Sequence, residues 1–319
     1  MSAHKVIFDT DPGIDDAMAL LFLHHHPAID LIGITTVFGN GDIEVTTRNA
    51  LYLKSLWQIA APVARGAGQP FDPARQPRPA AAHVHGDNGL GNVDVPETVD
   101  VPLDPRSAHR FIIETVRANP HEVTIIAVGR MTNLALALAE DPELPKLVKQ
   151  VIVMGGAVAT HGNVSPVAEA NILGDPEAAD TVMTAPWPLV LVGLDVTART
   201  VMTRAQLAEL GAAGGVRAMF LSDISQHYIR FYENLVPDGM MVHDSCACVY
   251  LVAPELFATQ SGPIRVVSGG IADGQTIQKP DGRWSPPGPW TDQPSQLACI
   301  GIDAPAVLQL IHDTIVDGA

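Results

Sequence analysis

The stretch "VIFDTDPGIDDAMAL", residues 6–20, contains the features that decide the fold. An apolar run at 5–9 is typical of a buried strand, and a helical pattern follows from Asp15 to His26. A Pro-Gly turn lies between them, so the chain opens with a strand, a turn and a helix. Four aspartates lie within eight positions around this turn: Asp9, Asp11, Asp15 and Asp16. Like charges at this density repel, and they are tolerated most easily around a cation or the positive end of a helix.

The same alternation of strand and helix continues along the chain. Further apolar strands are expected at 30–39, 122–129, 150–156 and 188–195, and helices at 48–57, 106–118, from 132 and at 175–184. This pattern predicts an α/β fold with a mostly parallel central sheet, a Rossmann-like core and helices on both faces. No linker, charge block or internal repeat divides the 319 residues, so we expect one domain over 1–319. The first helix should bury one stripe, formed by Ala17, Leu20, Leu21 and His24.

Four polar segments follow the predicted strands. They are "DTDPGIDD" (9–16), "FGNGD" (38–42), "VGRMTN" (128–133) and "MGGAVATHGNVSPVAEANILGD" (154–175). Ligands of open parallel sheets bind at the carboxyl ends of the strands. The sequence therefore predicts that these four segments together form a binding site.

The overall charge limits the kind of ligand. Nineteen basic and thirty-five acidic residues give a formal charge of −16, and no basic stripe is visible, so a nucleic-acid partner is not expected. Three cysteines, Cys246, Cys248 and Cys299, without a C-x-x-C pair do not suggest a disulfide framework or a structural zinc site. No apolar run approaches membrane-spanning length and "MSAHK" lacks a signal-peptide core, so we expect a cytoplasmic protein with no membrane partner.

Two explanations remain for the clustered aspartates. Asp11-Pro-Gly could form an ordinary turn, with Asp15 or Asp16 capping the helix that follows. One capping carboxylate is enough for that purpose, however, and here three follow a strand end. Hard divalent cations bind carboxylate and carbonyl oxygens, and a short loop can deliver several. We therefore favour a metal site.

Two further clusters also allow an ordinary and a functional interpretation. In "MVHDS", Asp244 could cap a helix beside an incidental His243, or Asp244 could bind the metal while His243 serves acid chemistry near neutral pH. In 162–179, the polar side chains could satisfy their own loop backbone or bind a ligand with several hydroxyl groups. The residues concerned are Asn163, Glu169 and Asn171, with Asn40 from "VFGN". No lysine or arginine anchors this group, so the bound part of the ligand should be neutral.

Taken together, these segments resemble the nucleoside hydrolase family of the inosine–uridine-preferring type. The resemblance rests on "DTDPGIDDAMAL", "VFGN", "IVMGGA", "GNVSPVAEANILGDPEAA" and "VHDS", in that order, and extends to about residue 252. D-x-D-P-G-x-D-D is its most specific motif. The chain departs from the family pattern at Ala170, where many members have an aromatic residue, and in "VGRMTN", "HDSCAC" and the last sixty or so residues. These departures leave the base preference open.

The resemblance implies a calcium-dependent enzyme that cleaves the N-glycosidic bond of ribonucleosides with water. By position, Asp11, Asp16 and Asp244 would bind Ca²⁺ together with the backbone carbonyl of Val128. Asp11 would also be the general base for the attacking water, and His243 would lie near the departing base. The ribose would be held by Asp15, Asn40, Met154, Asn163, Glu169 and Asn171.

The same resemblance implies further properties of the site and its partners. His85, in "HVHGDNG", matches a histidine near the base pocket in part of the family. The expected partner is a small-molecule ribonucleoside, and the expected assembly is a homodimer or homotetramer. Attack by a metal-held water on one face of the sugar would proceed by single displacement, through a transition state with oxocarbenium character.

Two other functions fit part of the pattern. Asp9-Thr10-Asp11 after an apolar strand also resembles the start of a haloacid dehalogenase-type phosphatase. That chemistry needs a downstream lysine and an acidic Mg²⁺ pair, for which we find no convincing candidates, and it would leave Asp15, Asp16 and Asp244 unexplained. A non-catalytic ribose or nucleoside sensor is the second alternative, and release of free base would distinguish it from an enzyme.

Overall fold

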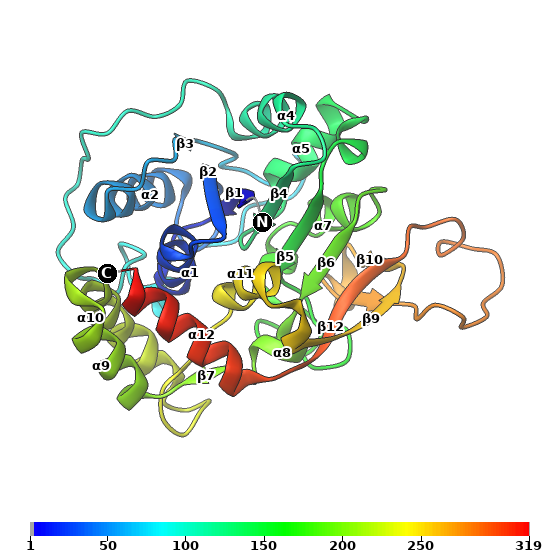
Figure 1. The fold of residues 1–319 in the computed structure, drawn as a ribbon. Helices are drawn as coiled ribbons and strands as arrows, with labels where there is room; N and C mark the ends of the chain where they lie inside the picture. Colours follow the sequence, from blue (N-terminus) through cyan, green and yellow to red (C-terminus); the bar gives the residue numbers. More distant parts are fainter. Residues whose placement is uncertain (1–2, 319) are drawn as a thin grey trace.

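The computed structural model describes residues 3–318 and places an eight-stranded sheet at the centre of the molecule (Figure 1). Seven strands are parallel, and β9 at one edge is antiparallel to its neighbour. In spatial order the strands are β3 (Val63–Ala64), β2 (Ile29–Thr36), β1 (His4–Thr10), β4 (Val123–Ala127), β5 (Gln150–Met154), β6 (Leu189–Val192), β12 (Gln296–Ile302) and β9 (Phe257–Gly262). The predicted mostly parallel sheet is confirmed.

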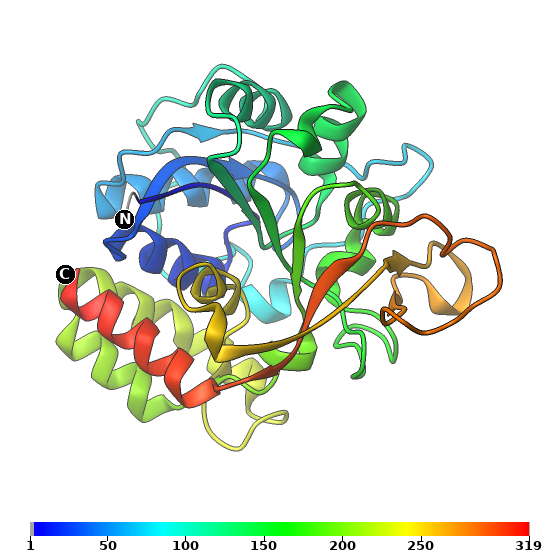
Figure 2. The ribbon, with the colours of Figure 1, turned by 45° about the vertical axis from the view of Figure 1, so that its right-hand side comes forward.

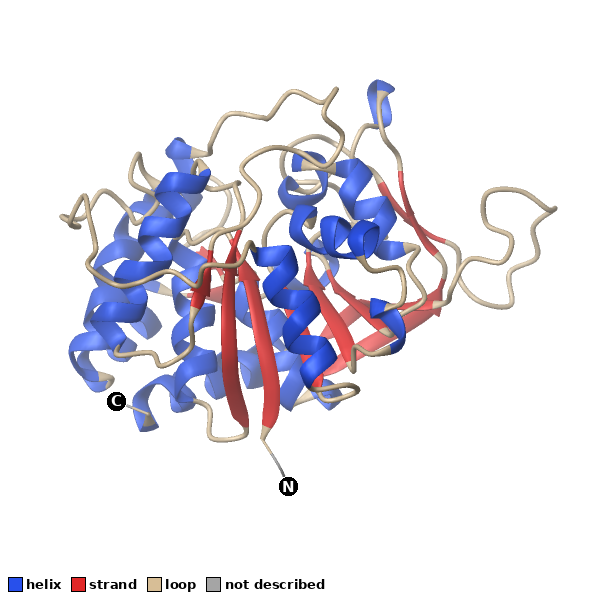
Figure 3. Ribbon diagram, turned by 90° about the horizontal axis from the view of Figure 1, so that it is seen from above, coloured by secondary structure: helices blue, strands red, loops and turns tan. Residues whose placement is uncertain are grey.

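Helices cover both faces of this sheet, as predicted (Figures 2 and 3). Side chains alternate across β1: Val6 and Phe8 join one apolar cluster and Ile7 joins the other. The first cluster includes residues of α1 (Ile14–His25), α2 (Ile43–Trp57), α9 (Arg204–Ala213), α10 (Gly215–Tyr232), α11 (Asp244–Val252) and α12 (Ala304–Asp317). The second includes residues of α4 (Ala108–Ala118), α5 (Thr132–Glu140) and α7 (Pro176–Met183).

Short elements complete this single-domain α/β fold. Two small antiparallel pairs lie outside the main sheet: β7 (Val201–Met202) with β8 (Met240–Met241), and β10 (Ile264–Val266) with β11 (Thr276–Gln278). The short helices are α3 (Ala82–His85), α6 (Ala170–Gly174), α8 (Leu194–Thr197), and the 3₁₀ turns η1 (Leu144–Lys146), η2 (Pro254–Leu256) and η3 (Gly270–Ala272). Within residues 3–318, no helix is both long and apolar enough to cross a membrane.

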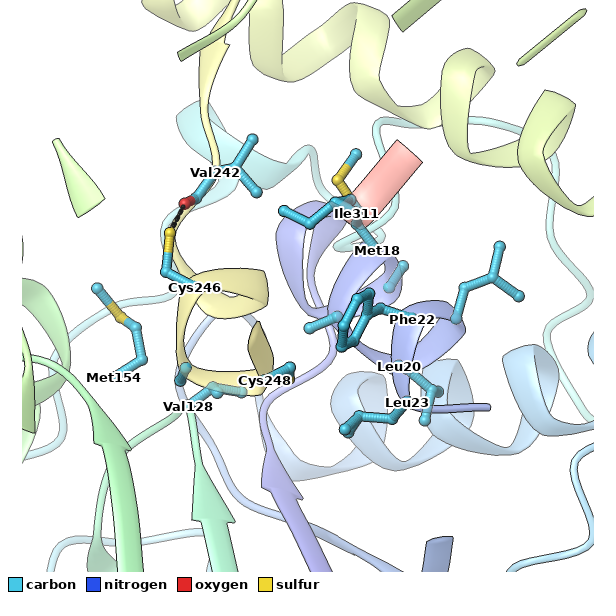
Figure 4. Close-up of a cluster of buried hydrophobic side chains, with 14 of the residues drawn as sticks. Met18, Leu20, Phe22, Leu23, Val128, Met154, Val242, Cys246, Cys248 and Ile311 are labelled. Carbon is cyan, nitrogen blue, oxygen red and sulfur yellow. Dashed lines mark hydrogen bonds between the residues drawn. The ribbon is translucent and has the colours of Figure 1, made fainter. Parts of the chain in front are cut away.

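Helix α1 is buried along its first ten residues, from Ile14 to Leu23, on all sides. It packs against β2, α10, α11 and α12. Figure 4 shows Met18 and Phe22 of α1 close to Ile311 of α12. The prediction of a single buried stripe was therefore wrong. Helices α10 and α12, which lie far away in the sequence, cover the sides of α1 that the pattern assigned to solvent.

The sheet topology brings the predicted polar segments together. Strands β1, β2, β4 and β5 end at Thr10, Thr36, Ala127 and Met154, and each of the four polar segments begins within two residues of one of these ends. Because the four strands are parallel neighbours, their carboxyl ends lie at the same edge of the sheet. The predicted convergence is confirmed, and it defines the position of the candidate site.

Candidate functional site

The first feature of the site is a group of three buried carboxylates. Asp15 and Asp16 lie in the first turn of α1, and Asp244 opens α11, which packs against α1. One oxygen from each lies within 4.8 Å of the others, and the three side chains are placed to hold a metal ion. Three acidic groups at this distance in the interior need a positive partner, because both burial and repulsion disfavour their charge.

The structure places Asp15 in this group, whereas Asp11, the ligand that the resemblance implies, is linked to Asp16 through Asn40. The backbone N–H of Asn40 donates to Oδ2 of Asp11 over 2.8 Å, and its side-chain Nδ2 donates to Oδ2 of Asp16 over 2.9 Å. Asp16 also accepts from the hydroxyl of Thr10 at 2.5 Å and from the backbone of Gly13 at 2.9 Å. In contrast, Oδ1 of Asp11 is buried without a hydrogen-bond partner. Oδ2 of Asp9 is also buried without a partner, so the case for a ligand at Asp11 rests equally on its link to Asp16 through Asn40.

The protonation of these carboxylates follows from their burial. Burial raises the pKa of Asp11 well above its ordinary value, repulsion from Asp16 adds to the rise, and the guanidinium of Arg130 opposes it. Burial and then Asp16 raise the pKa of Asp15 to about 7. Burial, followed by the charges of Asp15 and Asp16, also raises the pKa of Asp244. Hard divalent cations prefer such oxygen donors, so the donor set fits a cation of this class.

Arg130 is a site residue that was not predicted from the sequence. It stands in "VGRMTN", and only 6% of its surface is exposed. Its guanidinium lies 4.3 Å from the centre of the Phe38 ring, and Nη1 has no hydrogen-bond partner. Its positive charge acts on Asp11 and Asp175. The unusual residue in this motif therefore supplies part of the counter-charge for the carboxylates.

The carbonyl of Val128 lies at the same edge of the sheet. It accepts a hydrogen bond of 2.6 Å from Nδ2 of Asn171, which also approaches the carbonyl of Met154 at 3.2 Å and its sulfur at 3.5 Å. Three residues named from the sequence, Val128, Met154 and Asn171, thus meet at the ends of β4 and β5 and the start of α6.

Glu169 and Asn163 interact with the backbone of their own loop. Buried Glu169 caps α6: its carboxylate accepts from the backbone of Asn171 and Ile172 at 3.0 and 3.1 Å, and from Gly156 at 2.9 Å. Exposed Asn163 accepts from the backbone N–H of Ala170 at 3.1 Å. In this structure both side chains therefore accept hydrogen bonds from the backbone of their own loop. These bonds hold the loop that carries Asn171.

Four aromatic rings form one wall of the site. His85 stacks on Tyr228 with ring centres 5.2 Å apart, and Tyr228 meets Tyr232 edge to face at 4.9 Å. Tyr232 then hydrogen bonds to Nε2 of His243 at 2.8 Å, and Tyr228 donates to Oδ2 of Asp15 at 3.2 Å. We did not identify the two tyrosines from the sequence. Their i,i+4 spacing on α10 places them on one face, but nothing local connects that face to residues 15 or 243.

Both histidines of this wall are neutral at neutral pH. Burial lowers the pKa of His85 to about 3 and that of His243 to about 4. Nδ1 of His85 accepts a hydrogen bond from the backbone of Ile14 at 3.2 Å, so a neutral ring is also required by its partner. A neutral His243 can donate one hydrogen bond to a leaving group.

Asp9 has a different environment from the other aspartates of its motif. Its Oδ1 accepts from the hydroxyl of Thr35 at 2.5 Å and from Nδ2 of Asn133 at 2.7 Å. Asn133 also donates to the carbonyl of Thr36 at 2.9 Å and accepts from the backbone of Ala67. Asp9 of β1 therefore connects the end of β2, through Thr35, with the start of α5, through Asn133. These contacts lie next to the site and stabilise the strand ends that carry it.

The fold and the site define a class of protein: an α/β enzyme with buried carboxylates and a neutral histidine at the carboxyl edge of a parallel sheet. Comparison with known proteins narrows this class. The sequence profile of the family described as inosine-uridine preferring nucleoside hydrolase matches residues 6–309. The chain belongs to this family, and it is a nucleoside hydrolase acting on ribonucleosides.

Individual relatives are similar to this chain over nearly its whole length. Probable uridine nucleosidase 2 of Arabidopsis thaliana is 39% identical over 316 residues, which are 98% of each sequence. The plant nucleoside hydrolase PpNRh1 superposes with a TM-score of 0.93 at 35% identity, covering 98% of this chain and 99% of the other. A purine-preferring ribonucleoside hydrolase from Gardnerella vaginalis gives 0.90 at 32% identity, covering 98% of both. The resemblance inferred from the motifs is confirmed.

Proposed function

We propose that this nucleoside hydrolase uses Ca²⁺ and water to cleave the N-glycosidic bond of ribonucleosides, giving ribose and the free base. The observation that carries the proposal is the buried cluster of Asp15, Asp16 and Asp244, beside which Asp11 has a buried oxygen without a hydrogen-bond partner. Asp11, Asp16 and Asp244 would hold the ion together with the carbonyl of Val128. When bound, Ca²⁺ would polarise a water molecule and the vicinal ribose hydroxyls.

Asp11 is the proton acceptor in this proposal. Its Oδ2 is held by the backbone of Asn40, whereas Oδ1 has no hydrogen-bond partner and is available for the proton of water. The guanidinium of Arg130 favours the ionised carboxylate that a base must have.

The ribose is proposed to be held by the residues named from the sequence: Asp15, Asn40, Met154, Asn163, Glu169 and Asn171. Asp15 is part of the carboxylate cluster and accepts from Tyr228, and Asn171 donates to the carbonyl of Val128. Ribose hydroxyl groups can replace these partners. Glu169 and Asn163 hold the loop that carries Asn171. Their substitution should therefore alter ribose binding through the loop as well as through contact.

The base is proposed to leave along the aromatic wall, beside His85 and His243. A neutral His243 would donate a hydrogen bond to the negative charge that develops on the base. The named substrates of relatives differ, uridine for one and purines for another, so base preference has to be measured.

A panel of ribonucleosides, assayed for free base and reducing sugar with and without a chelator, tests the proposal. We expect turnover of at least one ribonucleoside, loss of turnover on chelation and recovery with added Ca²⁺. Release of phosphate from a phosphomonoester would support the phosphatase alternative. Tight ribonucleoside binding without release of base would support the sensor alternative.

We also propose that the chain forms a homodimer or homotetramer in the cytoplasm and takes part in purine or pyrimidine salvage. Light scattering coupled to gel filtration tests the assembly, and a mass equal to one chain of 33.8 kDa would contradict it.

A further inference from the structure

A continuous line of hydrogen bonds crosses the site from Asp15 to Thr197. Tyr228 donates to Oδ2 of Asp15 at 3.2 Å, and Tyr232 donates to the hydroxyl of Tyr228 at 3.4 Å. Nε2 of His243 lies 2.8 Å from the hydroxyl of Tyr232, and Nδ1 lies 2.8 Å from Oγ1 of Thr197. All five residues are buried.

Tyr228 donates its single proton to Oδ2 of Asp15, so its oxygen can accept from Tyr232. The hydroxyl of Tyr232 can donate its own proton either to Tyr228 at 3.4 Å or to Nε2 of His243 at 2.8 Å. The two tyrosines alone therefore do not fix the tautomer of His243.

Thr197 satisfies the other side of the same ring. With the proton on Nε2, Nδ1 of His243 is an acceptor and needs a donor, and Oγ1 of Thr197 is its partner. Thr197 is fully buried at the last position of α8, where its backbone N–H donates to the carbonyl of Gly193 at 3.1 Å. The hydroxyl is therefore held in place by the fold.

We propose that Thr197 is a positioning residue, whose hydroxyl donates to Nδ1 of His243 and holds the tautomer that carries a proton on Nε2. In this tautomer the single N–H of the ring points to the tyrosine side, where the base leaves. The inference rests on the proposed role of His243 as hydrogen-bond donor to the base. It also links the ribose contact Asp15 to the leaving-group donor through one chain of hydroxyls.

Removal of the hydroxyl should release this constraint. In Thr197→Val a methyl group replaces the donor at nearly constant volume, and either tautomer of His243 then leaves one ring nitrogen unsatisfied. The Nδ1–H form becomes populated, and in that form Nε2 has no proton to offer. Thr197→Ser keeps the hydroxyl and should keep the tautomer.

Nitrogen-15 NMR of the full chain, labelled at histidine, measures the tautomer directly. The ring signals of His243 are those that disappear in His243→Ala. We expect the Nε2–H pattern in the wild type and in Thr197→Ser, and a shift toward Nδ1–H in Thr197→Val. Unchanged His243 signals in Thr197→Val would overturn the proposal, whether or not the protein turns over nucleosides.

Kinetics supply the second measurement. On the best ribonucleoside of the panel, Thr197→Val should lower kcat about tenfold or more and leave KM within about twofold. A nitrophenyl riboside, whose leaving group needs no donor, should keep its kcat within about twofold. Thr197→Ser should recover most of the loss.

Thr200→Val is the matched control. Thr200 is also buried, three residues further along, and its hydroxyl donates to the carbonyl of Val196 instead of His243. It should leave both substrates and the His243 signals unchanged. An equal loss on both substrates in Thr197→Val would mean a structural role and contradict the proposal. A wild type without nucleoside turnover would instead refute the proposed function, and the NMR result would still stand.

Discussion

At the scale of the residue, the four aspartates of 9–16 differ in their environments. Asp9 and Asp11 each have one buried oxygen without a hydrogen-bond partner, but the other oxygen of Asp9 accepts from Thr35 and Asn133. The other oxygen of Asp11 accepts from Asn40, which also donates to Asp16. Asp11→Asn should therefore lower kcat by about 10²- to 10⁴-fold, because it removes the proposed proton acceptor at constant size. Steady-state assays, with Ca²⁺ binding followed by calorimetry, measure this effect.

Asp9→Asn is the matched control in the same motif. Burial raises the pKa of Asp9 to about 7, so a neutral side chain is already present in part at neutral pH. The amide oxygen can keep the hydrogen bonds from Thr35 and Asn133, while the amide nitrogen takes the place of Oδ2, which has no partner. The loss of activity should therefore be much smaller than in Asp11→Asn. Near-normal turnover of Asp11→Asn with metal bound would show that another residue is the base.

His243 belongs to the same scale. His243→Ala removes the proposed donor to the leaving base, so hydrolysis of natural ribonucleosides should fall by about 10²-fold, while a nitrophenyl riboside largely escapes. If His243 were only a neighbour of the helix start, both substrates would be unaffected or would fall together with the amount of folded protein. Comparison of kcat for the two substrates, with circular dichroism as a control for folding, separates these outcomes.

At the scale of the element, the turn after β2 sets the position of Asp11. A Cβ atom on Gly39 would lie 1.8 Å from Oδ2 of Asp11, which real structures do not allow. Gly39→Ala should displace this carboxylate, and both Ca²⁺ affinity and kcat should fall by about tenfold or more. Calorimetric titration with Ca²⁺ and steady-state assays test this expectation.

A glycine elsewhere in the chain offers a control for this substitution. A Cβ on Gly288 would meet its nearest neighbour, the carbonyl of Pro286, at 3.9 Å, which is ordinary contact. Gly288→Ala should therefore leave Ca²⁺ affinity and turnover unchanged. Retained Ca²⁺ affinity in Gly39→Ala would mean that the turn yields and that Asp11 is not positioned by it.

At the scale of the whole molecule, stability should depend jointly on pH and Ca²⁺. Burial and repulsion raise the folded pKa of the clustered carboxyls, to about 7 for Asp15. The folded protein then binds these protons more tightly than the unfolded chain does. Without metal, this contribution is complete below the unfolded pKa of about 4 and is lost as pH rises through about 7.

Calcium requires the deprotonated carboxylates, so its effect should have the opposite dependence on pH. The increase in melting temperature on addition of Ca²⁺ should grow from about pH 5 to about pH 8. The lowered pKa values of His85 and His243 affect the protein with and without Ca²⁺, so the difference between the two melts isolates the carboxylates. An increase in melting temperature that does not change with pH would contradict a site built from these groups. Asp244→Asn should make the increase caused by Ca²⁺ smaller.

Much of this architecture was predictable because it depends on local patterns. Apolar strands followed by helices predicted the parallel sheet, and the polar segments after four strands predicted the edge where the site lies. Parallel neighbours must end at the same edge, so the segments 9–16, 38–42, 128–133 and 154–175 were assigned to one site without coordinates. The resemblance to the family then implied which of their residues act there.

The tertiary structure alone determined how the other residues meet this edge. Helix α10 brings Tyr228 to Asp15 across 213 positions of sequence, and α8 brings Thr197 to His243 across 46. The burial of α1 on all sides likewise depends on α10 and α12. Such contacts depend on helix packing and leave no local period in the sequence. The sequence by itself therefore determined the sheet, its functional edge and the carboxylates. Packing decided which aromatic and hydroxyl groups face them, because those groups come from helices distant in the chain.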